Sequence, residues 1–218
     1  MKRFLLSCAL LLSSMAWAQS VGFGVHGNMI NSKINAKVKE IAGLTPTSGV
    51  LQVALDEVYG LGLGGGVHFD INLSVLTIRV SGDYITLSPD KDKFQAYVQQ
   101  VIPGLPVKFE DGGKVDMISG TANAKLNIIP LPVFKPYVTG GVGLSNVKAT
   151  EVTLTLGTTK LAPVSILKKQ TVATYNLGAG ADIELGGTTL FVELKVNWIG
   201  LEEGTSTYVP IVTAGLTF

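Results

Sequence analysis

Cysteine is almost absent from this chain of 218 residues, because Cys8 is the only one. The first 18 residues begin with two basic residues, continue with a short apolar run and end in Ala-Trp-Ala. This order is typical of a secretory signal peptide, so we predict that residues 1–18 are removed after Ala18 and that residues 19–218 form one domain. A lipoprotein cleavage box at Cys8 is not favoured, because too little apolar sequence precedes it. The mature chain is then expected to have neither disulfides nor thiol chemistry.

Long apolar runs and an excess of one charge are also missing. After residue 18, no stretch approaches the about 20 apolar residues that a membrane-spanning helix needs. Removal of two basic residues with the signal peptide reduces the 17 Lys and Arg residues to 15, against 16 Asp and Glu residues. This near balance provides no basic surface for nucleic acid, which we therefore exclude as a partner.

Catalytic motifs are absent as well. The chain has only two histidines, His26 and His68, and neither HExxH nor a nucleophile elbow occurs. The glycine run at 60–66 is not followed by a helix that could receive a phosphate; its glycines allow strands to coil closely, with a narrow polar passage as the alternative. Both histidines fall on the strand face assigned below to the interior, where hydrogen-bonded side chains are a simpler interpretation than a catalytic base. We expect no enzymatic activity, no cofactor and no metal site.

What the chain does contain is a regular alternation of side chains. Eight segments alternate between apolar residues on one side and polar residues or glycine on the other, which is the pattern of β-strands. The segments are residues 21–30, 58–70, 75–84, 118–128, 136–145, 173–185, 190–198 and 208–218. Short turns are predicted at 71–72, 130–132 and 186–187, and long connections at about 31–57, 86–113, 148–170 and 200–207. An even number of strands, with short turns at one end and long loops at the other, predicts an all-β, up-and-down antiparallel barrel.

The two faces of these segments differ in charge. One face is almost uncharged, whereas the other carries the charges and most of the glycines. A soluble barrel would place its polar face outward, but an apolar outer belt would aggregate in water and is suited to lipid. Aromatic residues near the strand ends of the apolar face fit the girdles of a membrane protein. These are Tyr59, Tyr84, Tyr175, Trp198 and Tyr208. We predict an eight-stranded transmembrane β-barrel, with a soluble sandwich as the alternative.

Three stretches carry a resemblance to a known family: "FKPYVTGGVGLS" at 134–145, "YNLGAGADIELGGTTLFVELKVNW" at 175–198, and the last strand, which ends on Phe218. They resemble the outer-membrane β-barrel domain family, the small eight-stranded barrels such as OmpA, OmpX and the opacity proteins. The resemblance implies the bacterial outer membrane as location, outer-membrane lipid as surroundings, and reading of Phe218 as an assembly signal by the barrel assembly machinery. The seventh segment ends in "NW" where relatives often have an aromatic-basic-aromatic sequence, which leaves the subfamily open.

Charged side chains on the inward face form the candidate site. An eight-stranded barrel is just wide enough to be filled by its own side chains, so these charges must pair or stay hydrated. The turn predicted at 186–187 places Asp182 opposite Phe191, and the turn at 71–72 places Arg79 opposite Gly64. We predict an ion-paired plug with Glu193 and Lys195 at its centre. The network consists of Arg79, Asp83, Lys125, Asp182, Glu184, Glu193 and Lys195.

The long connections contain patterns of their own. Residues 32–43 and 93–104 have apolar residues at helical spacing, which predicts two short amphipathic helices, while residues 151–167 alternate like strands and predict a hairpin. We expect a structural or surface-interaction role through extracellular loops, with an unknown partner. The alternative is a narrow pore or transporter for small or hydrophobic solutes, and a lipid-modifying outer-membrane enzyme is a third class.

Overall fold

The structure is a computed structural model of the chain. It describes residues 20–31, 35–38, 51–54, 59–73, 75–101, 106–129, 131–161, 163, 169–200 and 206–218. The signal peptide predicted at residues 1–18 lies outside the described residues.

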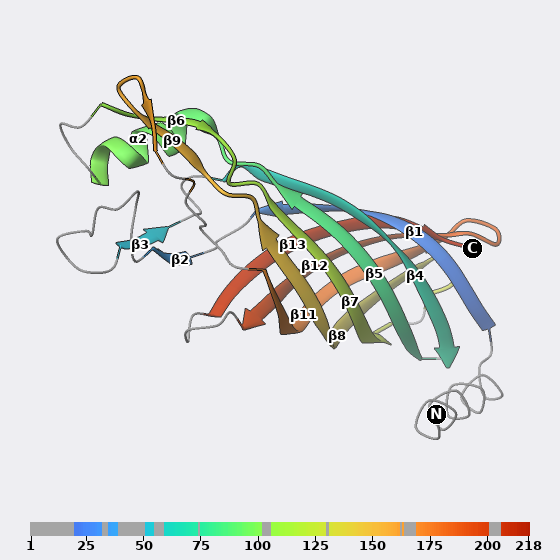
Figure 1. Cartoon of the computed structure of the whole chain (residues 1–218). Helices are drawn as coiled ribbons and strands as arrows, with labels where there is room; N and C mark the ends of the chain where they lie inside the picture. Colours follow the sequence, from blue (N-terminus) through green and yellow to red (C-terminus); the bar gives the residue numbers. More distant parts are fainter. Residues whose placement is uncertain are drawn as a thin grey trace.

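Eight long strands form a closed antiparallel barrel, as predicted (Figure 1). They are β1 (Ser20–Asn31), β4 (Leu61–Leu73), β5 (Leu76–Leu87), β7 (Val115–Asn127), β8 (Phe134–Ala149), β11 (Gln170–Glu184), β12 (Thr189–Gly200) and β13 (Ser206–Thr217). Each strand pairs with its sequence neighbours in the barrel, and β1 pairs with both β4 and β13, which closes the sheet. Along β7, buried and exposed residues alternate almost without exception, because successive side chains of a strand point to opposite faces.

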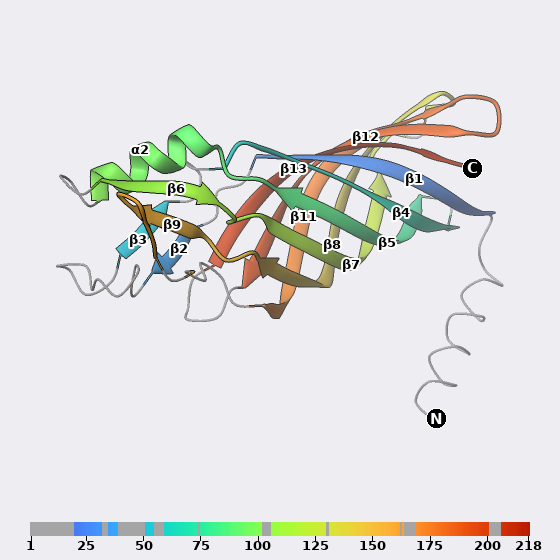
Figure 2. The same cartoon turned by 45° about the horizontal axis from the view of Figure 1, so that its top comes forward.

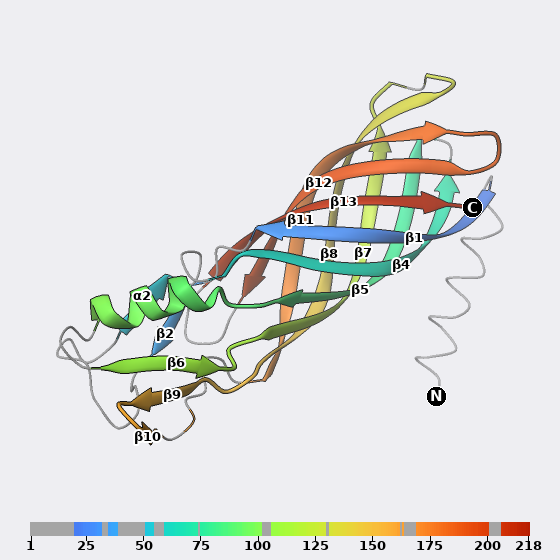
Figure 3. The ribbon, with the colours of Figure 1, turned by 90° about the horizontal axis from the view of Figure 1, so that it is seen from above.

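The two ends of the barrel differ in their connections. Short turns, the start of β1 and the C-terminal residue lie at one end, here called the turn end (Figures 1 and 3). The turn between β11 and β12 is built on Gly186 and Gly187, whose φ angles of 65° and 105° lie in the left-handed region that favours glycine. Long connections lie at the other end, the loop end, at the places where the sequence predicts them.

The connections at the loop end have their own secondary structure, which projects beyond the barrel (Figure 2). It comprises α2 (Lys91–Val101), a three-stranded sheet of β6 (Val107–Asp111), β9 (Thr153–Leu156) and β10 (Thr159–Lys160), and a two-stranded sheet of β2 (Asn35–Val38) and β3 (Leu51–Ala54). Helix α2 starts after Asp90, whose side chain accepts the N–H groups of Asp92 and Lys93 at 3.1 and 3.2 Å and so caps the helix.

Two of the three loop predictions are confirmed and one is wrong. Helix α2 falls in the stretch predicted as the second helix, and β9 and β10 fall in the predicted hairpin. The helix predicted at 32–43 is wrong at Asn35–Val38, which is a strand paired with β3, and the other residues of that stretch lie outside the described residues. Ala36 and Val38 alternate with Asn35 and Lys37, so the stretch also fits a two-residue repeat, and the available partner strand decides between the two.

The turn between β4 and β5 is also misplaced in the sequence prediction. Strand β4 runs through 71–72, and Leu73 pairs with Leu76, so Arg79 lies opposite Asp70 and not opposite Gly64. The shift keeps every side chain on its predicted face, but it gives the Arg79 guanidinium a carboxylate partner. Inside a barrel a charge without a partner is costly, which favours the observed register.

A hydrophobic core fills the loop end of the barrel. Inward positions that are polar in the middle of the strands become apolar there, and residues of the loops cover them. We call this cluster the apolar seal. Its inward strand residues are Ile30, Ile85, Leu87, Val115, Met117, Val147, Val172, Ile199, Val209 and Ile211, and its covering residues are Tyr59, Phe94, Val152 and Leu154.

Candidate functional site in the barrel lumen

The outer surface of the barrel is apolar along its length. Exposed large apolar residues occur on every strand of the barrel; examples are Phe23, Leu63, Val80, Ile118, Leu144, Leu177, Leu194 and Val212. Tyr175, Trp198 and Tyr208 lie side by side on β11, β12 and β13 and form one exposed aromatic row, as expected for a membrane girdle. Tyr84 is exposed as well.

Tyr59 does not belong to this girdle, which corrects the prediction. Its side chain is only 3% exposed and packs in the apolar seal, and its hydroxyl donates a hydrogen bond to the Gly113 carbonyl. Burial raises the pKa of Tyr59 above its ordinary range. The residue was misassigned because the strand begins at Leu61, so the alternation does not extend back to Tyr59.

Phe218 lies at the turn end, where the barrel closes. Its N–H donates to the Phe23 carbonyl at 2.8 Å, and the Phe23 N–H donates to the Phe218 carbonyl at 3.1 Å. The side chain is 61% exposed on the outer face. The last residue therefore completes the pairing of the first and last strands of the barrel.

One ion pair at the turn end joins Asp70 of β4 and Arg79 of β5. Nε and Nη2 of Arg79 donate to the two oxygens of Asp70, each at 2.7 Å, in a two-pronged arrangement. Both side chains are at most 6% exposed, and the Arg79 guanidinium also lies 4.2 Å from the centre of the Phe191 ring. Arg79 was predicted as a lumen residue, whereas Asp70 was not part of the predicted network, because its role depends on the register.

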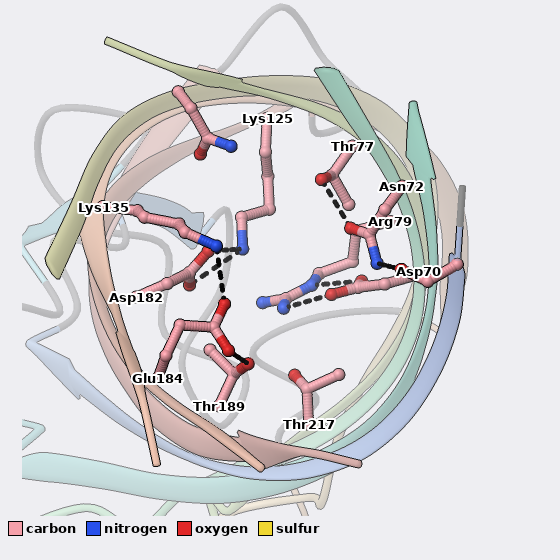
Figure 4. Close-up of a pocket in the computed structure, with 12 residues that line it drawn as sticks. Asp70, Asn72, Thr77, Arg79, Lys125, Lys135, Asp182, Glu184, Thr189 and Thr217 are labelled. Carbon is pink, nitrogen blue, oxygen red and sulfur yellow. Dashed lines mark hydrogen bonds and ion pairs between the residues drawn. The ribbon is translucent and has the colours of Figure 1, made fainter. Parts of the chain in front are cut away.

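Two further ion pairs lie at the turn end. Lys125 of β7 donates to both oxygens of Asp182 at 3.0 Å, and Lys135 of β8 donates to Glu184 at 2.8 Å. These pairs and the Asp70–Arg79 pair line a polar cavity of about 200 Å³ that lies at the turn end (Figure 4). Thr217 of β13 lies on its wall.

Glu193 and Lys195 lie deeper, next to each other on the inward face of β12. Lys195 Nζ is 3.3 Å from Glu193 Oε1, and the Tyr137 hydroxyl donates to the other oxygen of Glu193 at 3.1 Å. Tyr137 is fully buried and its ring also lies 4.1 Å from Lys125 Nζ. The ring therefore connects this pair to the Lys125–Asp182 pair.

Asp83, the last of the predicted charges, contacts no Lys or Arg within ion-pair distance among the described residues. Its Oδ1 accepts hydrogen bonds from His26 Nε2 at 2.7 Å and from Asn28 Nδ2 at 2.6 Å. His26 Nδ1 lies 3.1 Å from His68 Nδ1, and His68 Nε2 lies 2.8 Å from Thr217 Oγ1. Both histidines face inward as predicted, but sequence reasoning did not connect them to Asp83 or to each other.

Close strand packing at the histidines depends on glycine. A Cβ at Gly24 would collide with the Leu216 carbonyl and the His68 ring, and a Cβ at Gly66 would approach the Gly82 carbonyl and the His26 ring. The inward glycines of β1 and β4 therefore provide the space in which the two rings lie.

Four oxygen atoms in the middle of the lumen have no hydrogen-bond partner among the described residues. Three are the side-chain carbonyl oxygens of Asn123, Asn176 and Asn197, and the fourth is the Thr174 hydroxyl. Asn176 pairs with Asn197 and with Gly141, and Gly141 pairs with Asn123, so the three amides form one row across β7, β8, β11 and β12. The amide oxygens of such a row are suited to accept hydrogen bonds from water between the charged turn end and the apolar seal.

The lumen thus has three layers along its axis: charged pairs around the turn-end cavity, a polar middle, and the apolar seal. Within the described ranges, no helix has the length and apolarity to span a bilayer. No group of three or more His, Cys, Asp or Glu side chains in the same ranges could hold a metal ion.

The comparison with family models agrees with this architecture. Residues 4–215 match the model of the family described as outer membrane protein beta-barrel domain. No curated protein matches the chain. Among solved structures it is similar to Neisserial surface protein A, with 13% identity, 91% of this chain and 98% of that chain covered, and a TM-score of 0.49. It is also similar to Ail, the attachment invasion locus protein of Yersinia pestis, with 10% identity, 91% and 98% covered, and a TM-score of 0.43. The N-terminal β-barrel domain of Pseudomonas aeruginosa OprF shows 13% identity, 90% and 97% coverage, and a TM-score of 0.41.

Proposed function

This chain belongs to the outer membrane protein β-barrel domain family and lies in the bacterial outer membrane, and on that premise we propose that it is a sealed barrel with a structural or surface-interaction role. In this proposal the turn end faces the periplasm and the loop end faces outward. The small domain built from α2, β6, β9 and β10 is the surface available to an extracellular partner. No catalytic role is part of the proposal.

The observation that carries this proposal is the apolar seal. Ten inward strand residues and four covering residues close the loop end of the lumen. An ion that crosses this layer must lose its water without gaining polar partners, which costs several kcal/mol or more. The ion pairs below it add a second obstacle, because moving an ion past them requires a buried charge to lose its partner.

Planar-bilayer recordings test the sealed barrel. The unmutated protein is expected to show no steady conductance. The double variant Ile85→Thr/Ile211→Thr introduces two hydroxyls into the seal and is expected to increase permeation, whereas Val212→Thr, on the lipid-facing side of the same strand as Ile211, is the matched control. Steady conductance from the unmutated protein that is unchanged by Glu193→Gln or Lys195→Met would overturn the proposal and favour the narrow pore.

The proposed orientation is tested by epitope insertion. The turn between β9 and β10 contains Gly157 with a φ of 62° and exposed neighbours, so an inserted tag should be tolerated there. We expect antibody to stain this tag on intact cells. A tag at Gly186-Gly187, in the turn at the other end, should be stained only after permeabilisation, and the reverse pattern would refute the orientation.

Export and assembly complete the proposal. Residues 1–18 are proposed to be a signal peptide removed during export, and outer-membrane lipid surrounds the apolar belt. We further propose that the barrel assembly machinery reads Phe218, whose aromatic side chain remains exposed while its backbone is paired. The role of Phe218 is tested by the Phe218→Ala variant given in the Discussion.

A further inference from the structure

The charges inside the lumen do not balance among the described residues. Apart from the exposed Lys135–Glu184 pair at the opening of the turn end, the inward face of the barrel carries four carboxylates and three cations, a difference of one negative charge. The carboxylates are Asp70, Asp83, Asp182 and Glu193, and the cations are Arg79, Lys125 and Lys195. Three ion pairs use all three cations. Asp83 is therefore left with His26 and Asn28 as its partners.

With Asp83 ionised and both imidazole rings neutral, the hydrogen bonds around Asp83 assign the hydrogens of both histidines. An ionised carboxylate only accepts, so His26 Nε2 carries a hydrogen and, in a neutral ring, His26 Nδ1 is an acceptor. The contact between His26 Nδ1 and His68 Nδ1 at 3.1 Å then requires the hydrogen on His68 Nδ1. His68 Nε2 is consequently an acceptor, and Thr217 Oγ1 donates to it at 2.8 Å. The result is one directed chain from Thr217 through His68 and His26 to Asp83.

The outer end of this chain meets the turn-end cavity, whereas its inner end is buried. Thr217 lines the cavity of about 200 Å³. His68 is 1% exposed, and the rings of both histidines contact Phe191 edge-on, with centroid distances of 6.3 Å for His26 and 5.2 Å for His68. The apolar seal lies at the opposite end of the barrel. Among the described residues, the route for a proton to the histidines therefore starts at the turn-end cavity.

We infer that the Thr217–His68–His26–Asp83 chain is a binding site for one proton, filled from the turn-end cavity. The incoming proton attaches to His68 Nε2, and the Thr217 hydroxyl rotates from donor to acceptor. No hydrogen bond is lost: His68 donates from both nitrogens, His26 still donates to Asp83, and the lumen becomes neutral.

The geometry also limits the site to a single proton. The two Nδ1 atoms share one hydrogen, and a second extra proton would place two hydrogens in the same 3.1 Å contact. Neighbouring charges on other strands act on the site as well: Asp70 favours a positive charge on His68, Arg79 and Lys125 oppose it, and Lys195 stabilises the negative charge of Asp83. Arg79 and Lys125 are held by their own carboxylates, so Asp83 is the group whose charge the bound proton balances.

Nitrogen NMR of the folded barrel, labelled with ¹⁵N-histidine in micelles, tests this inference. The spectra are recorded from about pH 9 down to the lowest pH at which the barrel remains folded, so that protonation of a buried imidazole falls within the range. We expect His26 to keep its Nε2–H throughout, and His68 to gain a hydrogen on Nε2, with one proton bound per barrel. Two protons bound, or both rings neutral over the whole range while the barrel remains folded, would overturn the inference.

A variant separates proton binding from a purely structural role of the histidines. Asp83→Asn retains the size of the side chain and removes the charge, so the one-proton uptake at His68 should be lost. Glu184→Gln removes a carboxylate at the mouth of the same cavity and should leave the uptake unchanged. If Asp83→Asn binds its proton as the unmutated barrel does, Asp83 is not the charge that the site balances and the inference fails.

Discussion

Replacing Asp70 by Asn breaks the best-formed ion pair in the lumen while keeping the size of the side chain. The Arg79 guanidinium would lose its two-pronged ion pair, in which both N–O distances to Asp70 are 2.7 Å. It would remain buried, because Phe191 and the barrel wall surround it. Removal of one member of a buried pair generally costs about 3–5 kcal/mol, since the other charge is left without compensation. We expect Asp70→Asn to lower the free energy of unfolding by that amount.

The Lys135–Glu184 pair provides a matched control near the same end of the barrel. Its N–O distance of 2.8 Å is nearly the same, but its side chains are 33% and 36% exposed, against 6% and 5% for Arg79 and Asp70. Exposed pairs contribute only about 0–1 kcal/mol, because water screens them. Lys135→Gln should therefore lower the free energy of unfolding by no more than about 1 kcal/mol.

Reversible denaturant unfolding in micelles measures both variants. Trp198 is the only tryptophan after residue 18 and reports the transition by fluorescence. A further variant, Asp70→Leu/Arg79→Met, removes both charges and should recover much of the lost stability, as apolar replacements of buried pairs often do. Equal effects of Asp70→Asn and Lys135→Gln would refute the reasoning, because burial would then not decide the strength of these pairs.

Three further predictions concern backbone packing, assembly and the seal. Gly24→Ala should destabilise the barrel by about 1–3 kcal/mol in denaturant unfolding, because its Cβ collides with backbone and ring atoms, while the outward Gly82→Ala, with nothing within 4 Å, should be neutral or slightly stabilising. Phe218→Ala keeps the terminal backbone hydrogen bonds and should reduce outer-membrane insertion in cells more than folding into detergent; equal insertion of variant and parent in membrane fractions would contradict the assembly role. Tyr59→Phe leaves the Gly113 carbonyl without its donor, at a cost of about 1–3 kcal/mol, and should speed proteolysis of the loop end while the turn end stays protected.

The strands and their faces were predictable because two independent constraints act on them. The two-residue repeat assigns each side chain to one of the two faces of the strand. Because one face of the sheet contacts lipid and the other lines a narrow interior, the apolar face points outward. The apolar residues Val209 and Ile211 on the inward row of the last strand were the visible exception, and the structure places them in the seal. Apolar residues near the loop end of an otherwise polar inward face were therefore the available signal for a closed lumen.

The register of the strands could not be predicted to the same degree. When one strand shifts along its neighbour by two residues or a multiple of two, every side chain stays on the same face of the sheet. The turn predicted at 71–72 and the observed turn after Leu73 both place Arg79 inward, yet only the observed one pairs it with Asp70. The histidines show the same limit. His26 and His68 come together through the pairing of β1 with β4 across a long connection, where no turn length restricts the register.

The apolar seal and the charge imbalance together determine from which side the histidines can be protonated. A lumen open at both ends would equilibrate its histidines with both sides of the membrane, and Asp83 could be compensated by any cation that passes. If the seal closes the loop end as proposed, the described lumen is a chamber with one entrance, in which three cations are already paired and Asp83 has no cation within ion-pair distance. The smallest charge that fits such a chamber is a proton, and the hydrogen-bond chain from Thr217 to Asp83 leads from that entrance to that carboxylate. A sealed barrel is thus a condition for a proton site that responds to one side of the membrane only.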